Sequence, residues 1–121
     1  MADRVLFISW GQVVRGREER AIEAFNDSMG FYGRMQQEGR IESFDVALLE
    51  PHSGDLGGYI AVHGSTAQLA ALRADEEFRR LQIEVGMIID GQRVVEGYTG
   101  EGVASEMTLY SEAAGKVPQA H

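Results

Sequence analysis

The first apolar run of the chain predicts a strand. Residues 5–10 read Val-Leu-Phe-Ile-Ser-Trp, and a short run of β-branched and aromatic residues is typical of a strand buried on both faces. Gly16 can cap a helix that begins at about Arg17. Glu18 and Glu19 then fall in the first turn, where the helix dipole stabilises carboxylates. A strand followed by a helix therefore opens the chain.

The predicted helix carries one apolar face. Its large apolar side chains recur at spacings of three and four residues, at Ile22, Phe25, Met29 and Tyr32. Side chains at these spacings line one side of a helix, so we expect this side to pack against a sheet. Gly39 is expected to end the helix, because glycine readily adopts the left-handed conformation of a helix C-terminus.

Two strands follow and are expected to form a hairpin. Residues 41–50 alternate, with Phe44, Val46 and Leu48 on one side and smaller or polar residues on the other, as in a strand with two different faces. Residues 51–55 are rich in turn formers. Residues 59–63 then form a strand that returns beside the first one.

The second half of the chain repeats the order of helix and strand. Ser65 and Gln68 have the spacing of a capping box, which predicts a helix start at this point. The buried side of this helix is supplied by apolar residues between Leu69 and Val85. Asp90 and Gly91 lie between apolar runs and are themselves a hairpin signal. We place the last strand after this turn.

The C-terminal segment has two interpretations. We divide the chain into a domain of residues 1–104 and a C-terminal extension of residues 105–121. Ser105 could cap a short helix from about Glu106 to Ala114. Residues 107–110 could equally add an edge strand to the sheet.

The order strand, helix, strand occurs twice and predicts an α+β fold of the ferredoxin-like kind. In this fold a βαββαβ chain forms a four-stranded antiparallel sheet with two helices on one face. The other face of the sheet then lacks a cover. Because its strands are largely apolar, we expect a second copy to pack there, sheet on sheet, in a symmetric homodimer.

This order of elements, the chain length and the stretch from Leu72 to Leu81 (LRADEEFRRL) resemble the dimeric α/β-barrel superfamily. The resemblance covers about residues 4–100. It implies a dimeric α/β barrel, and it places the chain beside antibiotic-biosynthesis monooxygenases, small lactone isomerases, haem-handling enzymes and members without known activity. Asn26 and Trp10 do not match a motif of these enzymes, so the resemblance assigns no catalytic residue.

Composition narrows the choice of partners. The 121 residues contain 11 Lys and Arg against 19 Asp and Glu, a net charge of -8, which repels nucleic acid and anionic membranes. The chain has no cysteine, which excludes disulfides and thiolate chemistry. We expect no secretory signal and no membrane span, and we expect a cytoplasmic protein.

His63 is the first candidate for chemistry, because it lies at a strand end, just before a helix start, where an imidazole could act as a base. Tyr59 shares a strand face with His63, and the small Ala61 between them leaves room for a ligand. Asp45 is a second candidate carboxylate for catalysis. All three also fit ordinary sheet packing or solvation.

Two aromatic residues complete the candidate ligand site. Trp10 could stack on an aromatic ligand, although large aromatic residues at strand ends more often close the core. Tyr98 is a candidate polar partner of the ligand. We expect no cofactor and no metal site, because His52, His63 and His121 lack ligand spacing. A haem would have His63 alone as its ligand.

Two functions therefore stay open. The first is a cofactor-independent enzyme, monooxygenase-like or isomerase-like, that acts on a small apolar or aromatic compound between sheet and helices, with His63 as base. The second is a non-catalytic dimer that binds a small ligand or a protein. Converging polar groups around His63 would favour catalysis, and an apolar-lined interior would favour binding.

Overall fold

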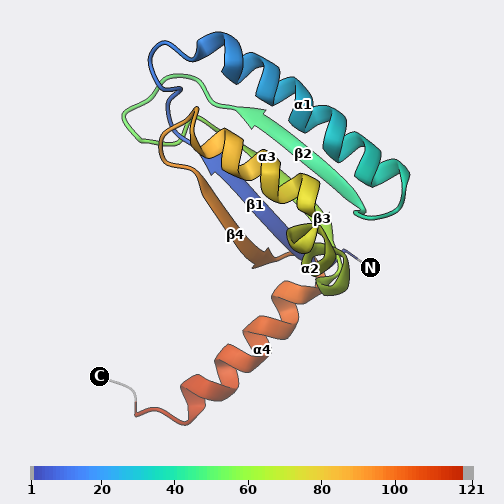
Figure 1. Cartoon of the computed structure of the whole chain (residues 1–121). Coiled ribbons are helices and arrows are strands. Elements are labelled where there is room, and N and C mark those ends of the chain that lie inside the picture. Colours follow the sequence, from blue (N-terminus) through green and yellow to red (C-terminus); the bar gives the residue numbers. More distant parts are fainter. Residues whose placement is uncertain (1, 119–121) are drawn as a thin grey trace.

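The computed structural model describes residues 2–118 and has the element order of a ferredoxin-like domain (Figure 1). Its elements are β1 (Arg4–Trp10), α1 (Glu18–Gln37), β2 (Ser43–Leu48), β3 (Gly58–Gly64), α2 (Thr66–Ala74), α3 (Glu76–Gly86), β4 (Arg93–Tyr98) and α4 (Glu101–Gly115). The strands form one antiparallel sheet in the order β2-β3-β1-β4. The predicted α+β class and ferredoxin-like plan are confirmed.

The register of the sheet decides which side chains face the helices. Ile8 of β1 lies opposite Ile60 of β3 and Val94 of β4, and Ile60 lies opposite Val46 of β2. Successive side chains of a strand point to opposite faces. This row therefore points to the face that α1 and α3 cover in Figure 1, and the intervening residues point to the other face.

The core lies between the helices and this covered face. Its buried members include Leu6, Ile8, Phe31, Tyr32, Met35, Ile41, Ile60, Val62, Leu69, Leu72 and Phe78. The predicted apolar stripe of the first helix was partly wrong, because Ile22 is 64% exposed. The buried residues of α1 are Ala24, Ser28, Phe31, Tyr32 and Met35. The packed face thus has the predicted spacing of three and four residues, but it begins at Ala24 and not at Ile22.

The second predicted helix is two helices. Ser65 caps α2 as expected, with its hydroxyl accepting from Gln68 N at 3.1 Å and Gln68 Oε1 accepting from Ser65 N at 2.9 Å. The chain then turns to an extended conformation at Asp75 (ψ 132°), whose carboxylate accepts a hydrogen bond from the backbone N–H of Phe78 and caps α3. Asp75 thus ends one helix and starts the next.

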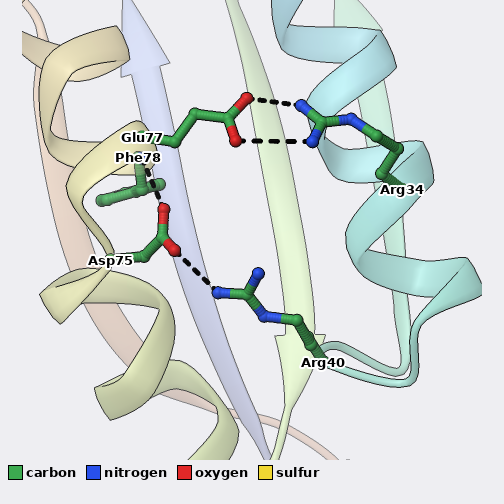
Figure 2. A network of polar contacts seen from close by, with 5 residues as sticks. All are labelled: Arg34, Arg40, Asp75, Glu77 and Phe78. Atoms are coloured by element: carbon green, nitrogen blue, oxygen red, sulfur yellow. Dashed lines mark hydrogen bonds and ion pairs between the residues drawn. The ribbon is translucent and has the colours of Figure 1, made fainter.

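Asp75 also joins this break to the end of the first helix (Figure 2). Arg40 Nη2 donates to Asp75 Oδ2 at 2.8 Å, while Asp75 Oδ1 accepts from Phe78 N at 2.9 Å. Arg34 of α1 forms an ion pair with Glu77 of α3 beside it. The Arg40 guanidinium, followed by the Phe78 N–H, lowers the pKa of Asp75. These contacts hold α3 against α1.

The C-terminal segment is a helix that projects from the end of β4 (Figure 1). The alternative of an edge strand over residues 107–110 was wrong, and so was the predicted start at Glu106, because α4 begins at Glu101. Residue 104 therefore lies inside α4. Only Gly102 of α4 is buried, where a side chain would meet the carbonyl oxygen of Asp3 at 2.3 Å. In residues 2–118 no helix is long and apolar enough to cross a membrane.

Replacing Asp75 by Ala should lower the free energy of unfolding by about 1–2 kcal/mol, because it removes both a helix cap and an ion pair. Asn keeps the capping acceptor and loses the charge, so Asp75→Asn should cost less. Urea unfolding followed by circular dichroism measures both values.

The contribution of the Asp75 charge should depend on pH. Its pKa is lowered in the folded chain, so the charge stabilises the fold above the unfolded-state pKa of about 3.9 and this stabilisation is lost as pH falls below it. The difference between wild type and Asp75→Asn should then shrink. Arg80→Ala, at an exposed ion pair with Glu76, is the control and should change stability little. An equal loss in this control would contradict the assignment.

Candidate functional site

A cavity of about 440 Å³ lies between α1, α3 and the covered face of the sheet. Its wall is formed by residues 8 and 10 of β1, 48 of β2 and 60 of β3, by residues 18–32 of α1, and by residues 82–89 at the end of α3 and after it. The volume is within the range of small-molecule sites, and the wall is mainly apolar, as in such sites.

The size of side chains along α1 explains why space is left here. Ala21, Ala24 and Ser28 follow one another at spacings of three and four and all line the cavity, whereas Phe31 and Met35 fill the core further along. Small side chains on the inner face hold the space open, because the helix backbone stays at the distance that the larger residues require. The cavity therefore lies under the N-terminal half of α1.

The mouth of the cavity lies where β1 ends and α1 begins. Ile22 and Leu48 line it with 64% and 67% of their surface exposed. Trp10 forms part of the wall beside Gly58 of β3, where a Cβ atom would come within 2.7 Å of the indole ring. A glycine at position 58 therefore lets the Trp10 ring lie over the neighbouring strand.

Three polar side chains form a chain of hydrogen bonds, which we call the relay, and two of them, Tyr32 and Gln82, belong to the cavity wall. Gln92 Nε2 donates to the backbone oxygen of Gln82 at 3.1 Å and to Gln82 Oε1 at 3.0 Å. Gln82 Nε2 donates to the hydroxyl oxygen of Tyr32 at 3.3 Å. Tyr32 is fully buried, and this burial raises the pKa of its phenol well above the usual range. The Tyr32 hydroxyl is therefore a neutral group.

Two further polar residues border the cavity. The Ser28 hydroxyl donates to the backbone oxygen of Ala24 at 2.8 Å. Glu18, at the mouth, accepts a hydrogen bond from Gly16 N at 3.2 Å. Backbone N–H groups, first its own and then that of Gly16, lower the pKa of Glu18, so this carboxylate is ionised at neutral pH. Within the described part of the chain, Glu18 is the one charged residue of the wall.

The structure divides the predicted site residues between two faces of the sheet. Trp10 lines the cavity. Tyr59 and His63 alternate with Ile60 and Val62, which are core residues, and so point to the uncovered face. The expectation that His63 acts as a base inside a pocket between sheet and helices does not agree with this arrangement, because a side chain of odd number on β3 cannot reach that pocket.

On the uncovered face the structure does bring His63 and Asp45 together. His63 Nε2 lies 3.0 Å from Asp45 Oδ2, across neighbouring strands. Tyr59 stacks on Phe7, with ring centroids 5.0 Å apart. The side chain of Asp45 is 72% exposed, so this carboxylate is solvated. An exposed dyad of imidazole and carboxylate thus lies outside the cavity.

Tyr98 lies away from both groups. It ends β4 opposite Arg4, and the Arg4 guanidinium lies 4.2 Å from the centre of its ring. Tyr98 therefore contributes a cation–π contact at the far end of the sheet.

Within residues 2–118 no group of three or more His, Asp or Glu side chains could hold a metal ion. His121 lies outside the described residues.

Comparisons with known proteins bear on the fold. No protein-family model matches the sequence, and no curated protein is significantly similar to it. A dimeric protein of unknown function and ferredoxin-like fold from Bacteroides fragilis superposes with a TM-score of 0.58 at 9% identity, over 79% of this chain and 96% of that one. This similarity supports the ferredoxin-like fold.

Two further solved structures are similar over most of the chain. SnoaB, a cofactor-independent oxygenase from Streptomyces nogalater, gives a TM-score of 0.49 at 17% identity, over 82% of this chain and 93% of that one. A NIPSNAP domain protein from Burkholderia xenovorans gives 0.46 at 13% identity, over 80% and 94%.

The raised pKa of Tyr32 can be measured directly. The absorbance of phenolate at 295 nm should contain a component that appears only well above pH 10 in wild type and is missing in Tyr32→Phe. Tyr110→Phe, at a position 69% exposed on α4, is the control and should keep this component.

Stability should also fall in alkaline solution. Because folding raises the pKa of Tyr32, its contribution is complete below pH 10 and is lost as pH rises above it. The free energy of unfolding of Tyr32→Phe should therefore depend less on pH in this range. Identical alkaline profiles for both proteins would contradict a buried phenol.

Proposed function

We propose that this protein binds a small, uncharged, apolar or aromatic compound in the cavity between α1, α3 and the sheet. The observation that carries the proposal is an apolar-walled space of about 440 Å³ with few polar residues in its wall. Apolar surface favours such a ligand through the hydrophobic effect, and the polar groups orient it.

Binding without turnover is the function that the geometry supports best. The imidazole that was expected to act as a base points away from the cavity, and no histidine among residues 2–118 lines the wall. Tyr32 is held as a neutral phenol by burial and cannot serve as a base near neutral pH. The described wall residues thus offer one potential base, the Glu18 carboxylate at the mouth, and no histidine beside it.

A cofactor-independent enzyme is the second candidate, and the pair of His63 and Asp45 favours it. The carboxylate 3.0 Å from Nε2 would fix the orientation of the imidazole. Such a base would act on a substrate held on the uncovered face, beside Tyr59 and Phe7. Catalysis in this form needs a second surface to enclose the substrate.

We infer that a second copy of the chain provides this surface and that the protein is a homodimer. In residues 2–118 no element covers the outer face of the sheet (Figure 1). The apolar side chains of this face are Val5, Phe7, Ala47, Tyr59, Ala61 and Val95, and its polar ones are Ser9, Ser43, Asp45, His63 and Arg93. The similar protein from Bacteroides fragilis is described as dimeric. Pairing of two such faces would remove this apolar surface from water.

Ligand binding can be followed with Trp10, the single tryptophan of the sequence and part of the cavity wall. Tetralin, an uncharged bicyclic hydrocarbon, should change the Trp10 emission in a saturable way. Ala21→Leu places three more carbon atoms into the cavity and should weaken binding about tenfold or more.

The matched control is Ala70→Leu, the same exchange at an exposed position of α2, which should bind tetralin as wild type does. His63→Ala should also bind normally, because His63 points to the other face. An absence of tetralin binding in wild type, or equal binding by Ala21→Leu, would contradict the proposed cavity function.

Dimerisation can be tested with Val95→Lys. Val95 is 53% exposed and lies beside Phe7 on the uncovered face, so a buried ammonium group there should weaken the dimer at least about tenfold. Ile83→Lys is the control, since Ile83 is 62% exposed on α3. Sedimentation equilibrium gives both dissociation constants, and a monomeric wild type would overturn the inference.

A further inference from the structure

The C-terminal helix α4 carries large apolar side chains on one face. Val103, Met107 and Tyr110 follow one another at spacings of four and three residues and are 47%, 55% and 69% exposed. Side chains at these spacings lie on the same side of a helix. Ser105 and Glu112 lie on the opposite side and are exposed as well. The three apolar residues form a surface, which we call the α4 stripe, that remains largely open to solvent.

The start of α4 is fixed to the domain, whereas the rest of the helix is not packed against it. Thr99 N donates to the backbone oxygen of Asp3 at 3.0 Å, and a Cβ atom on Gly102 would come within 2.3 Å of the same oxygen. Beyond Gly102 no residue of α4 is buried, and the helix leads away from α1 and α3 (Figure 1). Isolated helices of about 15 residues are marginally stable in water, so α4 needs a surface to pack on.

The charge of α4 narrows the kind of surface. The helix contains Glu101, Glu106 and Glu112 and neither Lys nor Arg. Helices that bind anionic membranes carry Lys and Arg on their polar face, and nucleic acid is bound through the same residues. The α4 stripe therefore fits an apolar protein surface and not a membrane or a nucleic acid.

The size of the uncovered sheet face indicates that a dimer needs more than this face. Its four strands have six or seven residues each. With about 3.3 Å per residue and about 4.8 Å between strands, the face spans about 400 Å². Stable protein interfaces bury about 800 Å² on each partner. Pairing of the two sheets alone thus provides about half of the contact that a stable homodimer requires.

Two copies of α4 can supply the rest. A helix of 15 residues is about 22 Å long and about 10 Å wide, so one side of it covers about 200 Å². In a two-fold symmetric dimer each protomer gives one α4 and receives another, which brings the contact on each protomer to about 800 Å². The helix begins three residues after Tyr98, the end of β4, and Val95 of β4 belongs to the uncovered face. It therefore leaves the domain from the edge of the inferred interface.

We propose that α4 is an exchange arm, which each protomer lays on the other with the α4 stripe against the partner. Gly102 fixes the root of the arm on its own domain, and Val103, Met107 and Tyr110 form the apolar contact. This inference rests on the homodimer proposed above and adds a second region of contact between the two copies.

The first test is the dimer dissociation constant of Met107→Glu, measured by sedimentation equilibrium of the full chain. It should rise about tenfold or more, because a carboxylate would be buried in an apolar contact. Glutamate is a good helix former, so α4 itself should persist. Ser105→Glu is the matched control, since it places the same charge two residues earlier on the opposite side of the helix. Its dissociation constant should be that of wild type.

A photocrosslink tests whether the α4 stripe touches the partner directly. With p-benzoylphenylalanine in place of Tyr110, irradiation of the purified protein should give a covalent dimer on a denaturing gel. The same group in place of Ser105 should give little of this product. A local effect of the exchange on folding would not produce such a difference.

The outcomes separate the exchange arm from the homodimer itself. A monomeric wild type would overturn both. If wild type is a dimer that Val95→Lys weakens and Met107→Glu does not, the sheet interface stands and the exchange arm is refuted. Equal crosslinking from positions 105 and 110, or none from position 110 in a dimeric protein, refutes the exchange arm in the same way.

Discussion

The two-residue repeat of the strands is the constraint on which both candidate surfaces depend. In β1 the side chains of Ile8 and Trp10 point to the helices and line the cavity, while Phe7 points to the uncovered face. The same alternation on β3 separates Ile60 from Tyr59 and His63. No rotation of a side chain can exchange these faces, so the molecule has two distinct surfaces on opposite sides of one sheet.

The helix layer determines what the covered face can do. Small residues in the first half of α1 leave a space over the sheet, and the large residues Phe31, Tyr32 and Met35 close it in the second half. The contacts of Arg40 with Asp75 and of Arg34 with Glu77 hold α3 beside the filled half of α1. The cavity thus persists at one end because the packing at the other end sets the distance between the layers.

Much of the fold could be predicted from the sequence, because its signals are local. Alternation in residues 43–48, the capping box at Ser65 and the turn at Gly91, which has φ +69°, each act within a few residues. The break at Asp75 was not predicted, although the large apolar residues Leu72 and Phe78 are six residues apart across it. Asp75 caps α3 locally through the Phe78 N–H, and its contact with Arg40 joins residues that are 35 apart in the chain.

The site was harder to predict than the fold for a related reason. Tyr32 was identified as a core residue of the first helix, which it is, but its chemistry depends on Gln82 and Gln92, which come from α3 and the loop before β4. Histidine and aspartate can be selected from a sequence as candidate catalytic residues because their side chains titrate near neutral pH or below it. A neutral relay has no such signature, since its direction is fixed by one backbone carbonyl that can only accept. The direction of these hydrogen bonds is therefore a property of three residues together, and it exists only once the two helices and the sheet have packed.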